Sequence, residues 1–270
     1  MLGIFFYFEN RIAYKLRRFV YDMGFWTIVN KVIGESDIVV FVLDARMPEM
    51  SWNDEIDRII TRKKKILVVV FNKIDLISAE ELNRLKIKHK GAFFVSGINN
   101  IGLKDLKTGL LIQGKRMGLF LPRIGVVGYP NVGKSAIINA LAHRSRAKVS
   151  AKSGTTRGVQ YIKVGDLKIL DSPGVVPYED KEVKLGLLAA KNPEKLRNPE
   201  KVAVNVISLF LEQNVEALEK FYNIKVSEDP YDIFTDIGKK RGFLAKGGVV
   251  DERRTAITIV RDWQRGKIKL

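Results

Sequence analysis

The sequence contains no cysteine among its 270 residues. That absence excludes disulfide bonds, cysteine-ligated zinc and a thiol nucleophile, and it fits a reducing cytosol. No run of apolar residues approaches the ~20 that a membrane-spanning helix needs. The apolar start at Met1 is broken early by Glu9 and Arg11, and no small-residue cleavage site follows, so we do not expect a signal peptide. From these absences we expect a cytoplasmic protein that is neither inserted in a membrane nor bound to one.

Acidic residues are scarce relative to basic ones. The chain has 47 Lys and Arg against 30 Asp and Glu, which gives a formal net charge of +17 at pH 7. Such an excess repels itself unless an acidic partner neutralises it, and the candidates are RNA, DNA and an anionic membrane surface. No basic amphipathic helix with an aromatic face stands out, which argues against the membrane surface. A hydrophobic content of 46% indicates a folded protein rather than a basic tail.

Strand and helix patterns alternate over the first two thirds of the chain. Short apolar runs rich in β-branched residues predict buried parallel strands at 38–45, 65–72, 92–97 and 123–129. Helical patterns cover parts of 10–34 and all of 51–60, 78–88, 101–112 and 134–142, with Ser51 and Ser78 as expected caps. A hairpin around Gly165 is predicted from 159–164 and 167–171. This alternation predicts a mostly parallel sheet covered by helices on both faces.

The strand signals stop after about residue 180. Helical patterns follow at 182–191, 200–221, 231–242 and 251–265, and Asn-Pro pairs at 192–193 and 198–199 mark breaks between them. We therefore place a domain boundary near residue 180 and expect a helical second domain.

The stretch GYPNVGKS, Gly128 to Ser135, fits the pattern G-x-x-x-x-G-K-[ST] between a predicted strand and a predicted helix. Glycines in this pattern allow backbone N–H groups to wrap phosphates, and the helix start adds a favourable dipole. Lys134 is then expected to reach the β and γ phosphates, and the Ser135 hydroxyl to ligate Mg²⁺. An ordinary glycine turn is the alternative, but it would not require the strand–turn–helix context.

The stretch NKID, Asn72 to Asp75, ends a predicted strand. The Asp75 carboxylate can accept from both guanine N1–H and N2–H₂, whereas adenine would leave it unpaired, at about 1.5–3 kcal/mol for each lost charged hydrogen bond. We expect Asn72 to fix the loop and contact N7, and the Lys73 stem to pack on the purine face. Ser96 and Gly97, on the next strand, are candidates to support the base through backbone N–H groups. The pattern favours GTP over ATP.

Two further stretches complete a phosphate site. In DSPG, residues 171–174, an acid at a strand end with a glycine three residues later suits a water-mediated contact to Mg²⁺ and an N–H that faces the γ-phosphate. Alone, the same tetrapeptide is an ordinary turn. In GTTRG, residues 154–158, we expect Thr156 to sense the γ-phosphate and Mg²⁺, with Thr155 as the fallback. A flexible polar loop is the alternative there, although a switch segment is also such a loop.

The order of these motifs is base reader, base support, phosphate loop, first switch, second switch. That is the usual GTPase order cut open between second switch and base reader, with the old ends joined, and a fold whose termini lie close together tolerates such a cut. Together with DARMPEMSWN (residues 44–53) and Gly102, the motifs resemble the signatures of circularly permuted GTPases of the YlqF/RbgA (YawG-type) family of ribosome-assembly factors. The resemblance covers about residues 15 to 270, and the tail resembles that of the large-subunit branch.

The resemblance implies an α/β fold, a Ras-like P-loop GTPase with a mostly parallel sheet in circularly permuted order and a C-terminal all-helical domain. It implies a GTPase domain over residues 1–180 and a helical RNA- and ribosome-binding domain over 181–270. Mg²⁺ and GTP or GDP are the implied cofactors, with Mg²⁺ held by Ser135, Thr156 and, through water, Asp171. The implied catalytic residues are Lys134, Thr156 and Gly174. The implied nucleotide-binding residues are Asn72, Lys73, Asp75, Ser96, Gly97, Pro130, Asn131, Val132, Gly133, Lys134, Ser135, Ala136, Thr156, Asp171 and Gly174.

The chain departs from many GTPases at the residue that orients the attacking water. A Gln often follows the DxxG glycine, but this chain has Val175, which cannot hydrogen-bond a water. Family members also carry an apolar residue there, and the bacterial ones place an N-terminal His near the water. This chain has only His89 and His143, so the role stays unassigned and we expect intrinsic turnover on the order of 10⁻³ s⁻¹ or less. Asn131 resembles the K⁺ ligand of potassium-activated GTPases, where a cation stabilises the developing charge.

The basic residues of the tail are candidate phosphate contacts, although a solvated helical face is the simpler interpretation of any single one. By resemblance, the partner is the large ribosomal subunit precursor and its ribosomal RNA, and we expect a monomer away from the ribosome. Trp263 and Phe243 are expected to pack in the core rather than to stack on bases. The RNA-binding candidates are Lys239, Lys240, Arg241, Arg253, Arg254 and Arg261.

Two other functions stay open. The chain could be an RNA-binding scaffold that holds guanine nucleotide as a structural lock, or a small-subunit assembly GTPase. Members of the small-subunit type carry an N-terminal OB domain or cysteine-based zinc modules, for which this sequence has neither the room nor the cysteines. For a hydrolysing enzyme, we hypothesise that loss of the γ-phosphate at Gly174 reorients residues 180–270, because the second switch runs directly into the helical domain.

Overall fold

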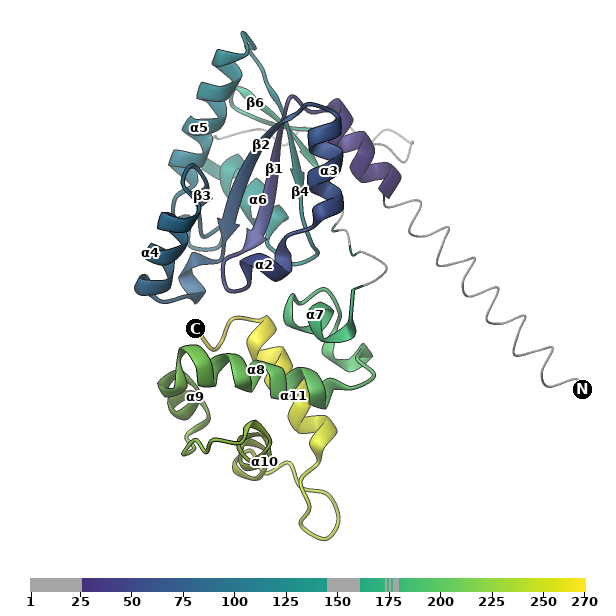
Figure 1. Ribbon diagram of the computed structural model, residues 1–270, viewed down its shortest axis with the longest axis vertical. Coiled ribbons are helices and arrows are strands. Elements are labelled where there is room, and N and C mark those ends of the chain that lie inside the picture. Colours follow the sequence, from purple (N-terminus) through teal and green to yellow (C-terminus); the bar gives the residue numbers. More distant parts are fainter. Residues whose placement is uncertain (1–25, 145–160, 173, 175, 177–179) are drawn as a thin grey trace, which may run out of the picture.

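The computed structural model describes residues 26–144, 161–172, 174, 176 and 180–270. Figure 1 shows a sheet flanked by helices and, beyond one end of the sheet, a separate group of helices. Of the helical pattern expected within 10–34, the described part forms a helix over 26–35, and the rest lies outside the described residues.

The described strands form a six-stranded sheet in the order β3-β2-β1-β4-β6-β5. Neighbouring strands run parallel except for the antiparallel pair β5 and β6, so the predicted mostly parallel sheet is confirmed. Although β4 comes fourth in sequence, it lies between β1 and β6, which places the phosphate loop at the middle of the sheet. The strands are β1 (Ile38–Asp44), β2 (Ile66–Asn72), β3 (Phe93–Phe94), β4 (Arg123–Val127), β5 (Tyr161–Val164) and β6 (Leu167–Asp171).

The central strand β1 explains why both faces of the sheet carry helices. All seven of its residues are buried, and successive side chains of a strand point to opposite faces. Its apolar even-numbered residues join a core with helices α5 (Leu103–Arg116) and α6 (Lys134–Arg144). Its odd-numbered residues join a second core with α3 (Asp54–Arg62) and the helix over 26–35. A strand that is apolar on both faces therefore requires the three-layer arrangement.

Two expectations about local structure are wrong. Helix α3 begins at Asp54 and is capped by Asn53, whose side chain accepts from the backbone N–H groups of Glu55 and Ile56. Ser51 instead ends the short helix α2 (Pro48–Ser51), because its hydroxyl bonds back to the carbonyls of that turn. The strand expected over 92–97 is only β3, since Ser96 turns away and pairs with Ile101. Helix α4 (Ala79–Lys88) has the predicted Ser78 cap.

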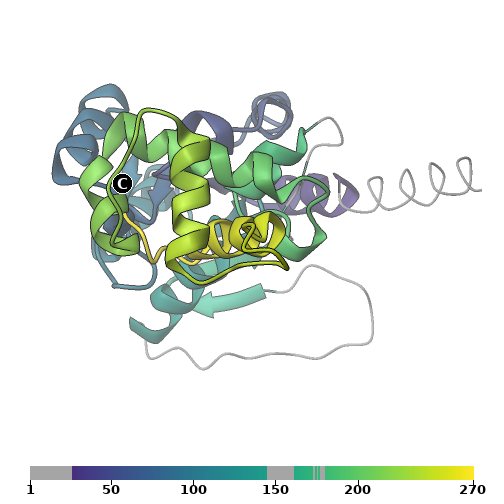
Figure 2. The ribbon, with the colours of Figure 1, turned by 90° about the horizontal axis from the view of Figure 1, so that it is seen from below.

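The helices after residue 180 gather beyond the carboxyl ends of the strands (Figures 1 and 2). They pack around Trp263, which is fully buried and meets the Phe210 ring edge-on at 5.9 Å between centroids. The helical pattern over 200–221 forms two helices, because the Asn214 side chain accepts from the Ala217 N–H and caps the second one. The helices are α7 (Glu182–Leu187), α8 (Pro199–Gln213), α9 (Val215–Tyr222), α10 (Pro230–Lys240) and α11 (Glu252–Gln264), with a 3₁₀ turn, η2 (Pro193–Lys195).

Within the part of the chain that the structure describes, no helix has the length and apolar character needed to cross a bilayer.

Candidate nucleotide-binding site

The phosphate loop joins β4 to α6 and adopts left-handed backbone conformations at three residues. The φ angles are 146° at Gly128, 59° at Asn131 and 97° at Gly133. A Cβ atom on Gly128 would lie 2.5 Å from the Val42 carbonyl oxygen, and one on Gly133 would lie 2.0 Å from Asn72 Nδ2. Both positions therefore need glycine. The loop leads into the N-terminus of α6, where free backbone N–H groups and the helix dipole favour a phosphate.

Lys134 begins α6 and is folded back over the phosphate loop. Its ammonium donates to the carbonyl oxygens of Gly128 at 3.1 Å and Tyr129 at 2.8 Å. Burial lowers the pKa of Lys134 to about 8, against the opposing effect of the Asp171 carboxylate. Neutral carbonyls compensate a buried ammonium less well than an anion does. The arrangement therefore holds a charged donor that a phosphate oxygen would bind more strongly than the carbonyls do.

Asn72 connects the two motifs that lie about sixty residues apart in the sequence. Its Nδ2 donates to the Val132 carbonyl in the phosphate loop at 2.8 Å, and its Oδ1 accepts from Gly97 N–H at 3.0 Å. The side chain is 3% exposed, so both bonds are shielded from water. The predicted loop-fixing role of Asn72 is thus visible, whereas its contact with guanine N7 stays a prediction.

Lys73 and Asp75 stand beside Asn72 at the end of β2. Lys73 has a left-handed φ of 67°, and its ammonium donates to Asp44 Oδ2 at 2.7 Å. Burial lowers the pKa of Lys73, with Asp44 opposing that effect. Asp75 lies in the 3₁₀ turn η1 (Ile74–Leu76) and is partly exposed. The Asp75 carboxylate has no hydrogen-bond partner among the described residues, which leaves it available to a base.

Ser96 and Gly97 support the base-reading loop in a different way from the one expected. The Ser96 N–H donates to the Ile101 carbonyl at 3.1 Å, and the Gly97 N–H donates to Asn72. Both N–H groups are therefore bonded within the protein and do not face a base in this arrangement. Gly97 also packs closely on the start of α6, since a Cβ there would lie 3.1 Å from Ile137 N. Gly97 therefore helps to hold the Asn72 side chain, and a role of Ser96 and Gly97 toward a base stays a prediction.

The residues at the end of β6 fit a Mg²⁺ ion. Asp171 Oδ1 is buried and has no hydrogen-bond partner among the described residues, and the Ser135 hydroxyl bonds to the same carboxyl group. Burial raises the pKa of Asp171, and Lys134 opposes the shift. Within the described chain, no three His, Cys, Asp or Glu side chains form a cage. Mg²⁺ is commonly held by one or two protein oxygens together with phosphates and water, so this donor set suits it.

Gly174 lies directly against the phosphate loop. A Cβ atom on Gly174 would lie 2.5 Å from the backbone of Pro130, which is too close for any side chain. Two residues before Gly174, the Ser172 hydroxyl donates to the Val126 carbonyl at 2.7 Å, which anchors the chain just after β6. Thr156, with Thr155 as its alternative, lies outside the described residues, so the assigned switch role stays a prediction.

The residue that would position the attacking water remains unassigned. Val175 lies outside the described residues. His89 directly follows the last residue of α4, and its ring lies tilted against Phe71, with 4.7 Å between the ring centroids. His143 is exposed in the last turn of α6. Both histidines therefore lie on other parts of the fold.

The phosphate loop also contacts the helical group, which the sequence reasoning missed. Asn131 Nδ2 donates to the Ala189 carbonyl at 2.6 Å. The Tyr129 hydroxyl bonds to Asp180 Oδ2 at 2.6 Å, and the Lys184 ammonium lies 5.0 Å from the Tyr129 ring centroid. The side chain assigned to K⁺ from the sequence, Asn131, thus uses its amide nitrogen to hold Ala189, two residues beyond the end of α7. The role of Asn131 as a K⁺ ligand stays a prediction. The ligand atom would be its Oδ1, because Nδ2 is bonded to Ala189.

A second missed feature is a buried ion cluster at the end of β1. Arg46 donates through Nε to Asp44 Oδ1 at 3.0 Å and through Nη2 to Asp44 Oδ2 at 2.8 Å, and Lys73 pairs with the same carboxylate. Burial alone would raise the pKa of Asp44, but the two cations outweigh it and hold that pKa well below its usual range. In the sequence, the motif DARMP (residues 44–48) pointed to this region, but it did not indicate which groups Arg46 contacts.

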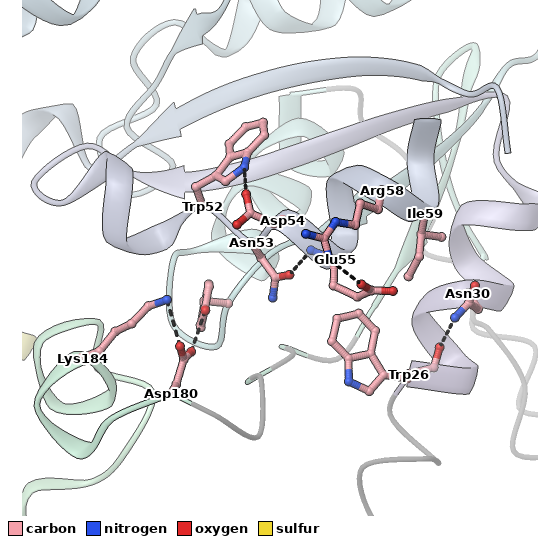
Figure 3. A pocket seen from close by; sticks show the side chains of 11 residues that line it. Trp26, Asn30, Trp52, Asn53, Asp54, Glu55, Arg58, Ile59, Asp180 and Lys184 are labelled. Atoms are coloured by element: carbon pink, nitrogen blue, oxygen red, sulfur yellow. Dashed lines mark hydrogen bonds and ion pairs between the residues drawn. The ribbon is translucent and has the colours of Figure 1, made fainter. Parts of the chain in front are cut away.

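A cavity of about 680 Å³ opens beside the phosphate loop, between α3 and α7. Figure 3 shows Trp26 and Trp52 on its walls and the Lys184–Asp180 ion pair at one side. Asn53, which caps α3, also lines it, and Asn53 Nδ2 is buried with no partner among the described residues.

The basic tail residues are mostly exposed, but some are already paired. Lys239 forms an ion pair with Asp236 at 3.1 Å, and Arg261 pairs with Glu194. The Arg254 guanidinium lies 4.4 Å from the centroid of the partly buried Phe243 ring. A cavity of about 530 Å³ runs between these groups, lined by Glu194, Phe243, Asp251, Arg253, Arg254, Ile257, Thr258 and Arg261.

The family described as 50S ribosome-binding GTPase matches residues 123–234. An uncharacterized GTP-binding protein of Methanocaldococcus jannaschii is 37% identical over 243 residues, and the aligned region covers 89% of this chain and 65% of that protein. The chain thus spans about two thirds of the length of that relative.

Shorter relatives match over nearly their whole length. Ribosome biogenesis GTPase A of Priestia megaterium is 35% identical over 252 residues, with 86% of both chains covered. Among solved structures, GNP-bound YlqF from T. maritima superposes with a TM-score of 0.53 at 24% identity, covering 86% of this chain and 89% of that one. This structural likeness supports the same fold.

Proposed function

Because the chain belongs to the YlqF/RbgA family of circularly permuted GTPases, we propose that it binds GTP and GDP with Mg²⁺, hydrolyses GTP slowly and acts in assembly of the large ribosomal subunit. We further propose that it works in the cytoplasm, as a monomer when it is away from the ribosome.

One observation carries the nucleotide part of this proposal. The hydrogen bond from Asn72 to the Val132 carbonyl joins the base-reading motif to the phosphate loop. Asp75 follows Asn72 on the same turn, and Lys134 follows Val132 in the same loop. A carboxylate and an ammonium at the two ends of one site match the two ends of a guanine nucleotide.

Each residue then has a chemical task. Asp75 accepts from the guanine N1–H and N2–H₂ groups, and Lys134 donates to phosphate oxygens in place of the loop carbonyls. The Gly174 N–H faces the γ-phosphate. Ser135 and Asp171, with Thr156, would hold Mg²⁺, which neutralises charge on the phosphates when bound. These residues position the nucleotide and stabilise charge on its phosphates, but no side chain is assigned to orient the attacking water. We therefore expect slow intrinsic turnover.

The proposed ribosomal partner rests on charge and on the relatives. The net charge of +17 calls for an anionic partner, and Lys240, Arg241, Arg253 and Arg254 are exposed on the helical group. Relatives are named ribosome biogenesis GTPase A, and the matching family is described as 50S ribosome-binding. We therefore assign the tail to ribosomal RNA of the large subunit precursor.

A scaffold that binds RNA and keeps its nucleotide unhydrolysed is the second candidate, favoured by Val175 in place of the usual glutamine. Turnover separates the two. We expect GTP hydrolysis on the order of 10⁻³ s⁻¹ or less for the free protein and a clear stimulation by isolated large subunits. The same assays in K⁺ and in Na⁺ test Asn131 as a cation ligand. Tight GTP binding with no stimulated turnover would support the scaffold, and stimulation by small subunits alone would support a small-subunit factor.

The base-recognition claim is tested by Asp75→Asn. Xanthine carries a C2 carbonyl where guanine carries an amino group. The amide at position 75 can donate to that carbonyl, but it cannot accept from both guanine donors as the carboxylate can. We expect GDP affinity to fall by about 1.5–3 kcal/mol for each lost charged hydrogen bond, and XDP affinity to rise relative to it. Calorimetric titration of both nucleotides measures the exchange. An Asp75→Asn protein with unchanged GDP preference would refute Asp75 as the base reader.

A further inference from the structure

The last turn of α11 lies against the guanine-reading end of the site. Arg46 Nη1 donates to the Trp263 carbonyl at 2.9 Å, and its guanidinium carbon lies 4.1 Å from the Trp263 ring centroid. The same guanidinium holds Asp44 through Nε and Nη2, as described above. Arg46 therefore binds two partners at once. Its Nε and Nη2 bind the Asp44 carboxylate, which pairs with Lys73, and its Nη1 binds the Trp263 carbonyl in the helical group.

The chemistry of this contact favours arginine. Trp263 lies in the last turn of α11, where its carbonyl accepts from the Gly266 N–H at 3.0 Å as well as from Arg46, and where the helix dipole attracts a cation. The Arg46 side chain is fully buried, and the Asp44 side chain is 1% exposed. Only a planar fork can hold both carboxylate oxygens and still donate to a third acceptor. With α11 removed, one N–H edge of Arg46 would lose its acceptor.

A second contact joins the same two regions. The Leu270 N–H donates to the Leu76 carbonyl at 3.0 Å, and Gly266 packs on the Leu76 side chain. Leu76 is the last residue of η1, the turn that carries Asp75. Both sides of the base-reading motif, Lys73 and the Asp75 turn, are therefore supported by residues 263–270.

We propose that Arg46 is a positioning residue for guanine recognition and that docking of residues 263–270 on Arg46 and Leu76 is required for tight binding of guanine nucleotides. This inference rests on the proposed function, since it concerns the affinity of the same site. It makes the helical group part of the base-recognition machinery, in addition to any contact that this group makes with RNA.

The Arg46 contact is tested by Arg46→Lys, because lysine keeps the charge but cannot span Asp44 and Trp263 together. We expect GDP affinity, measured by calorimetry on the full chain, to fall about tenfold. Arg123→Lys is the matched control. Arg123 makes the same two-point contact with Asp37, with Nε to Oδ2 at 3.1 Å and Nη2 to Oδ1 at 2.6 Å, at the opposite end of the strands. That variant should stay within about twofold of the parent.

A cycle with Lys73→Met distinguishes positioning from general damage. If Arg46 acts through Asp44 on Lys73, Arg46→Lys should change GDP affinity by less than about twofold once Lys73 is Met. A tenfold loss that persists in the Lys73→Met background would mean that Arg46 does not act through Lys73, and would overturn the positioning role.

The helical side is tested by a glycine pair. Gly266 has φ of 66°, and a Cβ atom there would lie 2.7 Å from Leu76 Cδ1. Gly242, after α10, has φ of 68° with nothing within 4 Å. Both Gly→Ala variants thus carry the same backbone strain, but only Gly266→Ala places a methyl group against the side chain of Leu76, a residue of the base-reading turn. We expect a loss of GDP affinity of about fivefold or more for Gly266→Ala and less than about twofold for Gly242→Ala.

The outcomes separate this inference from the function on which it rests. A parent chain that binds GDP no better than ADP would contradict the proposed function. A parent chain that prefers GDP, with equal affinities in Arg46→Lys and Arg123→Lys and in the two glycine variants, would overturn the inference alone. If Arg46→Lys fails to fold by circular dichroism, the glycine pair decides the result.

Discussion

At the scale of single residues, the site is built on buried charges that are compensated only in part. Lys134 rests on carbonyl oxygens, whereas Asp44 is shared between two cations. A buried cation without a full counter-charge has a lowered pKa and binds an anion strongly. Nucleotide binding should therefore be linked to a proton at Lys134.

The pH dependence of binding follows from the Lys134 pKa of about 8. Below that pH the free site already carries the charged ammonium; above it the site must take up a proton before phosphate can bind, so the affinity falls as pH rises through the pKa. At pH 8 we expect uptake of about half a proton per GDP, and at pH 7 about a tenth. Calorimetry in two buffers of different ionisation enthalpy measures this number. Equal heats in both buffers at pH 8 would contradict the linkage.

At the scale of elements, the phosphate loop is a strand-to-helix turn whose close contacts exclude side chains. Gly128, Gly133 and Gly174 each lie against other backbone or against Asn72. The loop is therefore fixed before nucleotide arrives, which reduces the entropy lost on binding. These contacts explain why the short motifs require glycine: at each of the three positions, a Cβ atom would collide with a different neighbouring group.

Replacement of Gly133 by alanine tests this fit. Gly133 has φ of 97° and its Cβ would meet Asn72 Nδ2 at 2.0 Å, whereas Gly91 has φ of 87° with nothing within 4 Å. Both alanine variants should lose about 1–3 kcal/mol of unfolding free energy from backbone strain. Only Gly133→Ala should also lose GDP affinity, by about tenfold or more. The reason is that the new methyl group displaces the Asn72 side chain, which braces the phosphate loop through its hydrogen bond to Val132. Denaturant melts and GDP titrations on both variants provide the two measurements. Similar GDP affinities would show that the brace is dispensable.

At the scale of the whole molecule, the helical group contacts both ends of the site. Asn131 and Tyr129 meet the segment around α7, Arg46 meets the last turn of α11, and Leu76 meets the segment that follows α11. The Trp263 indole nitrogen donates to the Leu187 carbonyl at 2.8 Å, which joins these two contacts inside the helical group. The predicted link from the γ-phosphate to residues 180–270 runs through positions outside the described residues, and it stays a prediction.

The charge of the molecule predicts a steep salt dependence of RNA binding. If about six phosphates are neutralised on the large-subunit RNA, the log-log slope of affinity against salt should be about −5. Replacing exposed Arg253 and Arg254 together by glutamine should make the slope less steep by about 2. Arg84, whose guanidinium pairs with Glu80 within helix α4 and outside the C-terminal helical group, offers a control that should leave the slope unchanged. Filter binding across a salt series measures each slope. A parent slope near zero would exclude a phosphate-contacting tail.

Much of the fold follows from local patterns. Apolar runs such as 38–45 predict strands buried on both faces, and the structure confirms the parallel sheet and the helices over it. Boundaries were less predictable where polar side chains compete for backbone groups. Ser51 and Asn53 are both good caps by type, and only the packing of α2 against β1 decides that Asn53 is free to cap α3.

Residue types and spacing alone were enough to identify the motifs and their permuted order and to predict a guanine-nucleotide site, because glycines at tight turns and a carboxylate for guanine are local requirements. The side chains that connect those motifs became visible in the packed fold alone. Asn72 on Val132, Arg46 on Trp263 and Asn131 on Ala189 each join segments distant in the chain. Hydrogen bonds of this kind depend on where whole elements pack, and residue type alone does not specify that placement.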